Sequence, residues 1–272
     1  ESESRGLGDV YKRQSLDKPY VAVNHLEGHA LTARLTNNIE YPYLLLLVSG
    51  GHTQIIAVLE YGKYSRLSST LDDAAGETFD KAAKILDIGF PGGPMIEKMA
   101  MSGDPKSYQL PRPMYKSKNP NFSFSGLKTA FNQTVLKNTL TKNNISNLSA
   151  SIQKAISDCL VDRTRVALDQ FKMMINKNSN VQLVVAGGVA SNKYIRNELE
   201  KLAFISNTKF HAPPINLCTD NGAMIAWAGY EKYIYEGETN LNFKPRPRWP
   251  LDPDAHQKNP IHSKIGKSGV KA

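Results

Sequence analysis

The stretch YLLLLVSGGHT, residues 43–53, predicts a buried strand that ends in a tight turn. Tyr43–Ser49 is almost wholly apolar, which is typical of a strand covered on both faces. Two glycines follow as the turn, and Thr53–Leu59 has the apolar and β-branched residues of a second strand. These segments predict a β-hairpin with Ser-Gly-Gly-His exposed at its tip, and Tyr64–Ser69 can form a third strand.

The rest of the chain alternates predicted strands and helices. Gln182–Ala186 is a buried strand, a glycine pair forms a turn, and a helix begins near Ser191, whose hydroxyl is a suitable N-cap. A strand, a glycine pair and a helix point backbone N–H groups at an anion. With the first glycine turn, this arrangement predicts an α/β fold with a nucleotide cleft between two lobes. Further predicted elements are strands at 20–24 and 210–212 and helices at 74–86, 95–101, 127–138, 148–175, 191–204 and 220–235.

Two histidines, His25 and His29, lie four residues apart where a helix is predicted. Residues at this spacing share one helix face, so both imidazoles could bind one metal ion. Surface or structural histidines also fall at this spacing by chance, so the pair alone does not establish a metal site. Further along, Asp72 and Asp73 are interpreted as caps of the helix that begins at Ala74.

The composition is that of a globular protein, with 272 residues, 40% apolar and 22% charged. No apolar run approaches the roughly 20 residues of a membrane span, and the first residues resemble neither a signal peptide nor a transit peptide. Cys159 and Cys218 provide no disulfide framework, which favours a reducing compartment. We therefore expect a cytoplasmic protein without a membrane partner.

The net charge is +9, and the last segment, residues 244–272, is rich in Lys, Arg, Pro and Gly. Such a segment is either a solvated, flexible tail or an electrostatic aid to binding a polyanion such as RNA. Composition alone leaves both alternatives open. Residues 1–14 show no periodicity and are interpreted as an unrelated or disordered leader.

Seven short motifs occur in an order that resembles the tRNA N6-adenosine threonylcarbamoyltransferase family, formerly called O-sialoglycoprotein endopeptidases. The resemblance extends from about residue 18 to about residue 252. The motifs are Asn24-His25-x3-His29, Leu47-Val48-Ser49-Gly50-Gly51-His52-Thr53, Asp72-Asp73-Ala74-Ala75-Gly76-Glu77-x2-Asp80-Lys81, Pro91-Gly92-Gly93-Pro94, Phe124-Ser125-Gly126-Leu127-Lys128-Thr129, Ala186-Gly187-Gly188-Val189-Ala190-Ser191-Asn192 and Cys218-Thr219-Asp220-Asn221-Gly222-Ala223-Met224.

The resemblance implies an actin-like, sugar-kinase-like (ASKHA) fold with two α/β lobes. It also implies an acyltransferase that moves the threonylcarbamoyl group of threonylcarbamoyl-adenylate to N6 of adenosine 37, in tRNAs that read codons beginning with A. The implied cofactor is one Fe(2+) ion per subunit, with zinc as the alternative. The implied partners are tRNA, a non-catalytic paralogous subunit and a small ATPase.

The resemblance also assigns roles to individual positions. Two histidines and one aspartate match the metal ligands and would leave open metal positions for substrate oxygens. Asp80 and Gly93 match positions on the ribose side of the adenylate, Asn192 matches one near its base, and no general base is evident. The metal ligands are His25, His29 and Asp220, the substrate-binding residues are Leu47, Val48, Ser49, Gly50, Gly51, Asp80, Gly93 and Asn192, and further candidates are His52, Gly187 and Gly188.

The chain departs from the family pattern before His25, where a Gly-Ile-Glu-Thr-Ser-type hairpin and a further Gly-rich segment are missing. We therefore expect an N-terminal truncation and an incomplete first lobe. Leu47 resembles the bacterial and organellar branch, whereas the other branch has a metal-binding tyrosine there. This favours a bacterial cytoplasm, with the mitochondrial matrix as the alternative if a targeting segment has been lost. The expected division is a leader at 1–14, a remnant of the first lobe at 15–70, the second lobe at 71–212, a closing helix that returns to the first lobe at 213–243, and a flexible basic tail at 244–272.

Three other functions compete with the transferase. A zinc peptidase needs a glutamate directly after the first histidine or directly before the second, whereas Glu27 lies in the middle and points away from the histidine face. A kinase of the same fold gives no reason for the histidine pair. A non-catalytic scaffold that binds tRNA or a nucleotide remains the alternative, and it would need no metal.

Overall fold

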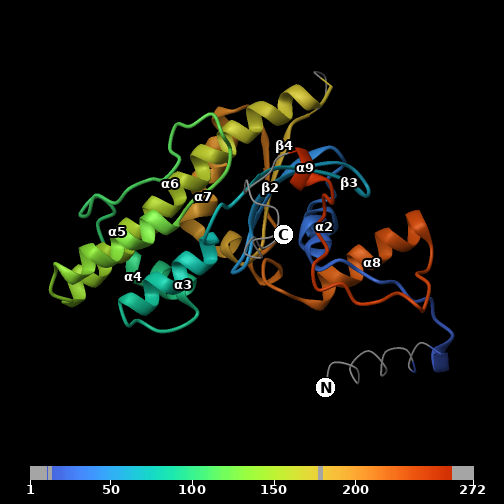
Figure 1. The fold of residues 1–272 in the computed structure, drawn as a ribbon, viewed down its shortest axis with the longest axis horizontal. Coiled ribbons are helices and arrows are strands. Elements are labelled where there is room, and N and C mark those ends of the chain that lie inside the picture. The colour runs from blue at the N-terminus through green and yellow to red at the C-terminus, as the bar shows by residue number, and fades with distance from the viewer. Residues whose placement is uncertain (1–10, 12–13, 177–179, 259–272) are drawn as a thin grey trace.

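The computed structural model describes residues 11, 14–176 and 180–258, and its centre is one five-stranded sheet (Figure 1). The order of the strands is β3-β2-β1-β4-β5. β1 pairs antiparallel with β2 and parallel with β4, so the sheet is mixed. The strands are β1 (Tyr43–Val48), β2 (Thr53–Glu60), β3 (Lys63–Ser69), β4 (Gln182–Ala186) and β5 (Lys209–His211).

β1 lies in the middle of the sheet and is buried along its whole length. Successive side chains of a strand point to opposite faces, so Leu44 and Leu46 join one core cluster whereas Leu45 and Leu47 join the other. Because both faces are covered, the strand is almost wholly apolar. The predicted buried strand and the hairpin that follows it are confirmed.

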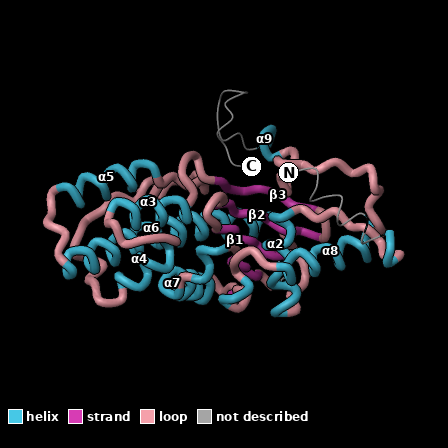
Figure 2. The backbone as a smooth tube through the Cα atoms, turned by 90° about the horizontal axis from the view of Figure 1, so that it is seen from below, coloured by secondary structure: helices cyan, strands magenta, loops and turns pink. Residues whose placement is uncertain are grey.

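Helices cover both faces of the sheet. Figures 1 and 2 show α3 to α7 gathered on one side and α2 and α8 on the other, so the fold has three layers. The helices are α2 (His25–Asn37), α3 (Ala75–Ile85), α4 (Gly92–Ala100), α5 (Ser125–Leu136), α6 (Lys142–Met174), α7 (Lys193–Ile205), α8 (Gly222–Glu236) and α9 (Ala255–Lys258), with short 3-10 turns η1 (Gly188–Ser191) and η2 (Ile215–Leu217).

The sheet joins strands from residues 43–69 with strands from residues 182–211, on both sides of the predicted lobe boundary at residue 70. β1 and β4 are direct parallel neighbours, with Leu44 opposite Leu183 and Leu47 opposite Ala186. The carboxyl ends of both strands therefore meet at one edge of the sheet. The division into lobes stays a prediction.

The predicted strand at residues 20–24 is wrong, because this segment pairs with the chain at too few points. Among the bonds of the described residues, its backbone has Thr239 as its only distant partner: the carbonyl of Tyr20 accepts the N–H of Thr239, and the N–H of Ala22 donates to the hydroxyl of Thr239 at 3.0 Å. Asn24 instead acts as the N-cap of α2, where its Oδ1 accepts a hydrogen bond from the N–H of Leu26 at 3.0 Å. The segment is thus an extended lead into α2.

Three further helix starts differ from their predictions. α4 begins before Met95, because the carboxylate of Asp80 accepts the N–H of Gly92, and α6 begins before Leu148. Ser191 does not cap α7, since it belongs to η1. The cap is Asn192, whose Oδ1 accepts the N–H of Ile195 at 3.0 Å.

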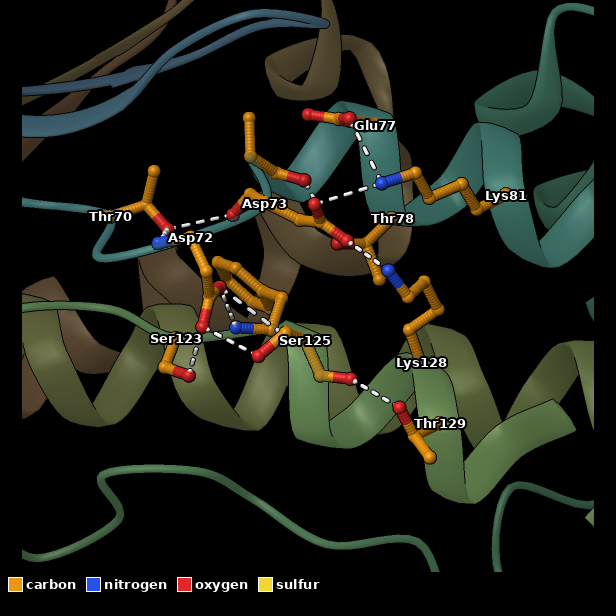
Figure 3. A network of polar contacts seen from close by, with 12 residues as sticks. Thr70, Asp72, Asp73, Glu77, Thr78, Lys81, Ser123, Ser125, Lys128 and Thr129 are labelled. Atoms are coloured by element: carbon orange, nitrogen blue, oxygen red, sulfur yellow. Dashed lines mark hydrogen bonds and ion pairs between the residues drawn. The ribbon is translucent and has the colours of Figure 1, made fainter. Parts of the chain in front are cut away.

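Asp72 does not cap the helix at Ala74, which has no side-chain cap. Its carboxylate turns to α5 and accepts the N–H groups of Phe124 and Ser125 at 2.7 and 3.2 Å (Figure 3). The hydroxyls of Ser123 and Ser125 donate to the same carboxylate at 2.6 and 2.8 Å. Asp72 is therefore a cap supplied from outside the helix, and sequence spacing could not reveal it.

Asp73 also does not cap this helix, and it joins α3 to α5 instead. Lys81 of α3 and Lys128 of α5 donate to its two carboxylate oxygens at 2.8 and 3.0 Å (Figure 3). Burial alone would raise the pKa of Asp73, but the hydrogen bonds from the two lysines outweigh it and lower the pKa. Lys81 also pairs with Glu77 at 3.0 Å.

The described part of the basic segment, residues 244–258, packs on the body of the protein. The side chain of Asn24 donates to the carbonyl of Trp249 at 2.7 Å, and the N–H of Arg66 donates to Asp252 at 2.9 Å. Residues 259–272 of the predicted tail, and residues 1–10, 12 and 13 of the predicted leader, lie outside the described residues. None of the helices in the described part combines the length and apolar character that a membrane crossing requires.

We expect Asp72→Ala to lower the free energy of unfolding by about 2 kcal/mol, because α5 loses its cap and the N–H groups of Phe124 and Ser125 lose their acceptor. Urea denaturation followed by circular dichroism measures this. Asp169→Ala is the control, since Asp169 is exposed and its ion pair with Arg165 is long, at 3.9 Å. Equal stability of the two variants would contradict the assigned cap.

Candidate metal centre and adjoining pocket

α2 presents His25 and His29 on one face, as their spacing predicts. Their ring centroids are 5.0 Å apart, and the rings meet edge to face. The side chain of His29 is 4% exposed, whereas that of His25 is 54% exposed. This part of α2 packs closely against α8. A Cβ added to Gly28 would lie only 3.1 Å from the side chain of Ile225. One ligand is therefore held rigidly and the other lines the opening.

Asp220 reaches both histidines from the turn before α8. The predicted start of this helix is residue 220, but the helix begins at Gly222. Asn221 is the N-cap of α8, and its Oδ1 accepts the N–H of Met224 at 2.9 Å. Asp220 therefore lies outside the helix, in the turn before it. Its Oδ1 is 3.2 Å from Nε2 of His25 and 3.0 Å from Nε2 of His29.

The three side chains fit a metal ion. Their ligand atoms all lie within 4.8 Å of one another. Metal–nitrogen and metal–oxygen bonds of about 2.0–2.2 Å place neighbouring ligand atoms about 3 Å apart. Two imidazoles and one carboxylate suit iron or zinc and leave further positions open. The group His25, His29 and Asp220 could thus hold one such ion.

Electrostatics favour the ligating form of His29. Burial lowers the pKa of His29, the neighbouring His25 lowers it further, and the carboxylate of Asp220 opposes both effects. A lowered pKa keeps the imidazole neutral, and only the neutral ring has a lone pair for a metal.

Two hollows meet at this edge of the sheet. The metal pocket, which holds the three candidate ligands, has a volume of about 540 Å³, and the adjoining pocket has about 210 Å³. They share the wall formed by Gly50, Gly188 and Thr219, so they are two parts of one cleft. The metal pocket is lined by His25, Leu26, His29, Ser49, Gly50, Gly51, His52, Gly188, Thr219 and Asp220. The adjoining pocket is lined by Gly50, Gly76, Phe79, Asp80, Pro91, Gly93, Pro94, Glu97, Gly188, Val189, Ser191, Asn192 and Thr219.

Close backbone contacts shape this cleft. Gly187 has φ +95°, and a Cβ there would lie 2.3 Å from the carbonyl oxygen of Val48. A Cβ on Gly76 of α3 would lie 2.5 Å from the carbonyl oxygen of Ser49. The glycine turn after β1 is therefore fixed between α3 and the turn after β4. Gly187 is therefore needed so that the end of β4 can pack against the end of β1. From the sequence, the same glycine could equally have been needed to let a ligand approach the backbone.

The structure brings most of the predicted site residues to the cleft. Leu47 and Val48 differ, because their side chains are fully buried in the two core clusters on opposite faces of β1. Asp80 lines the adjoining pocket, with one carboxylate oxygen engaged by the N–H of Gly92 at 2.8 Å. Asn192 also lines it, and its amide donates to Gln153 at 2.8 Å.

Nine lining residues were missed as site residues by the sequence analysis: Leu26, Gly76, Phe79, Pro91, Pro94, Glu97, Val189, Ser191 and Thr219. Gly76 and Thr219 stand inside quoted motifs, so their position was an available signal. Glu97 lies on α4, where its carboxylate accepts the N–H of Lys193 at 2.7 Å. No pattern in the sequence distinguishes it from a solvated helix residue.

We expect the protein to bind one Zn²⁺ or Co²⁺ ion, and Asp220→Asn to weaken this binding at least 100-fold, since the group loses its only charged ligand. Isothermal titration calorimetry with Zn²⁺ and the absorption bands of bound Co²⁺ measure this. Asp169→Asn, an exposed carboxylate on α6, is the matched control. Unchanged affinity in Asp220→Asn would refute the assigned ligand set.

We expect Gly76→Ala to lower the free energy of unfolding by about 2 kcal/mol, because the new methyl group overlaps the backbone of Ser49. Gly222→Ala is the control, since a Cβ there meets nothing within 4 Å. Thermal and urea unfolding compare the two variants. A stable Gly76→Ala protein would show that the contact between α3 and the glycine turn is looser than described.

Comparisons with known proteins bear on the family of this chain. Residues 13–227 match the family model of TsaD, tRNA N6-adenosine threonylcarbamoyltransferase. The chain is 51% identical over 262 residues to the tRNA N6-adenosine threonylcarbamoyltransferase of Rhodospirillum rubrum, covering 95% of this chain and 70% of that protein. The same enzyme of Brucella suis is 51% identical over 256 residues, covering 94% of this chain and 70% of that protein.

Two solved structures resemble the fold at low sequence identity. Full-length HypF in the phosphate- and nucleotide-bound form has a TM-score of 0.57 at 15% identity, over 82% of this chain and 37% of that chain. HypF of T. kodakarensis has a TM-score of 0.62 at 13% identity, over 84% of this chain and 38% of that chain. This likeness concerns the fold alone and confirms the predicted α/β, ASKHA-type class. The family-model match and the 51% identity together show that the chain belongs to the tRNA N6-adenosine threonylcarbamoyltransferase family.

Proposed function

We propose that this chain transfers the threonylcarbamoyl group from threonylcarbamoyl-adenylate to N6 of adenosine 37, in tRNAs that read codons beginning with A. The observation that carries the proposal is the shared wall of the two pockets at Gly50, Gly188 and Thr219. A substrate with a nucleotide at one end and a reactive acyl group at the other matches such a divided cleft.

The adjoining pocket suits the nucleoside half of the substrate. One carboxylate oxygen of Asp80 is held by Gly92, and we assign the other to a ribose hydroxyl. Gly93 has nothing within 4 Å of an added Cβ, so its backbone is open to a ligand. Phe79 and Pro94 provide apolar wall, and Asn192 lies on the side that we assign to the base.

The metal pocket suits the reacting half. A metal ion bound there would polarise the carbonyl of the mixed anhydride as a Lewis acid. His29 is buried and fixes the direction of its imidazole, whereas His25 and Asp220 are exposed and face the opening. The hydroxyl of Ser49 accepts the N–H of His52 at 3.1 Å and so stiffens the glycine turn opposite these ligands.

The reaction requires the amine of adenosine to attack the carbamoyl carbon. The N6–carbon bond forms, the bond from that carbon to the phosphate oxygen breaks, AMP leaves and N6 loses one proton. The exocyclic amine is a weak nucleophile, so much of the rate must come from holding both substrates in line. Glycine turns and parallel strand ends provide a rigid frame for this positioning.

The finer assignments follow the family resemblance. We propose Fe(2+) as the cofactor, with zinc as the alternative, since nitrogen and carboxylate ligands suit both. We propose a non-catalytic paralogous subunit and a small ATPase as partners, and the bacterial cytoplasm as the location. The bacterial relatives in Rhodospirillum and Brucella support this location.

The test is transfer of labelled threonylcarbamoyl from its adenylate to unmodified tRNA, with the proposed partner subunits present. We expect label on adenosine 37, and a loss of rate on the order of 100-fold or more in His25→Ala and Asp220→Asn, because the carbonyl is no longer polarised. Asp169→Asn controls for the loss of a carboxylate far from the cleft. A protein that binds tRNA, transfers nothing and needs no metal would be the scaffold instead.

A further inference from the structure

We propose that a basic strip, Phe243–Trp249, binds the phosphate backbone of the tRNA anticodon stem-loop and holds it beside the metal pocket. This inference rests on the proposed function for the identity of the RNA. None of the strip residues lines the metal pocket or the adjoining pocket, so the strip has no part in the proposed reaction.

The strip concentrates positive charge on a stiff segment. Lys244, Arg246 and Arg248 alternate with two prolines, and all three cations are exposed. No acidic residue occurs between Phe243 and Trp249. Proline restricts its own backbone and that of the residue before it, so the backbone that carries the cations loses little freedom on binding. Such a row of cations suits the evenly spaced phosphates of a nucleic acid.

Two aromatic rings hold the central cation in place. The guanidinium carbon of Arg246 lies 5.0 Å from the ring centroid of Phe243 and 5.2 Å from that of Trp249. The two rings are 5.3 Å apart. Stacking leaves the N–H groups at the edge of the guanidinium available for a phosphate, and arginine binds phosphate in this planar, two-pronged way.

The strip is anchored next to the metal ligands. The side-chain amide of Asn24 donates to the carbonyl of Trp249 at 2.7 Å, and Asn24 is the N-cap of α2, directly before His25. Upstream of the strip, the N–H of Thr239 donates to Tyr20 at 2.7 Å. Figure 1 shows the chain after α8 returning past the start of α2 on its way to α9. The strip therefore has a fixed position relative to the metal pocket.

Two charged residues beside the strip are already paired or buried. The ammonium of Lys232 lies 5.4 Å from the ring centroid of Trp249 and pairs with Glu236 at 3.5 Å, so it adds no net charge to the strip. Asp252, beyond the strip, is 5% exposed and accepts the N–H groups of Arg66 and Asp254. Its charge is thus directed into the protein.

RNA is the polyanion that this location favours. Adenosine 37 lies in the anticodon loop, so a phosphate-binding surface beside the metal pocket would place that loop at the reacting group. Phe243 and Trp249 are only half-buried, so they add aromatic surface on which unpaired bases can stack. An anionic membrane is the competing partner, and the experiment below separates the two.

The experiment compares the triple variant Lys244→Gln, Arg246→Gln, Arg248→Gln with Lys106→Gln, Lys137→Gln, Lys142→Gln. The control removes three exposed cations from the segments around α5 and α6. Fluorescence anisotropy measures binding of a labelled, unmodified anticodon stem-loop by the whole chain between 50 and 200 mM salt. We expect the strip variant to bind about 10- to 100-fold more weakly, with a salt slope reduced by about 2, and the control to change less than about 2-fold.

Two results would overturn the inference: equal weakening in both triple variants, which would indicate net charge alone, or no weakening in the strip variant. Vesicles of phosphatidylserine and phosphatidylcholine are the second probe, and strip-dependent vesicle binding without an effect on RNA also overturns it. Zn²⁺ binding and thermal unfolding show that the variants remain folded. If the strip binds RNA but the wild-type protein transfers nothing, the proposed function fails while the RNA surface stands.

Discussion

A Cβ at Gly187 would lie 2.3 Å from the carbonyl oxygen of Val48, so the ends of β1 and β4 meet only through a glycine. The two strands are parallel, and their carboxyl ends therefore open at the same edge of the sheet. Ligand sites of α/β proteins form at such edges. Gly76 repeats the constraint on the other side, where α3 packs against Ser49. The position of the two pockets next to each other thus depends on contacts between backbone atoms.

The metal group depends on how α2 and α8 are held together. Arg34 of α2 donates to Glu231 of α8 at 2.7 Å, and Tyr41 donates to the other oxygen of the same carboxylate at 2.9 Å. Glu231 is 4% exposed, and a buried charge that loses its partners is costly. This pair fixes the two helices against each other. The position of Asp220 relative to His29 follows from that packing.

Several motif residues serve the site indirectly. Asp72 contacts α5, and Asp73 contacts Lys81 of α3 and Lys128 of α5, rather than the cleft. They hold α3, and α3 carries Gly76 and Asp80 to the adjoining pocket. The basic strip shows the same principle at the other end of the chain, since Asn24 both caps α2 and binds the strip. Motifs in this fold thus combine positioning with direct contact.

The sequence by itself determined the buried β1, the hairpin after it, the shared face of His25 and His29, and the order of motifs that marks the family. These features depend on local periodicity and spacing, which are written in consecutive residues. Only the tertiary structure decided the cap of α5 by Asp72 and the shared pocket wall formed by Gly50, Gly188 and Thr219. It also decided the approach of Asp220 to both histidines. Each depends on residues that are distant in the chain and meet only when the helices and the sheet pack.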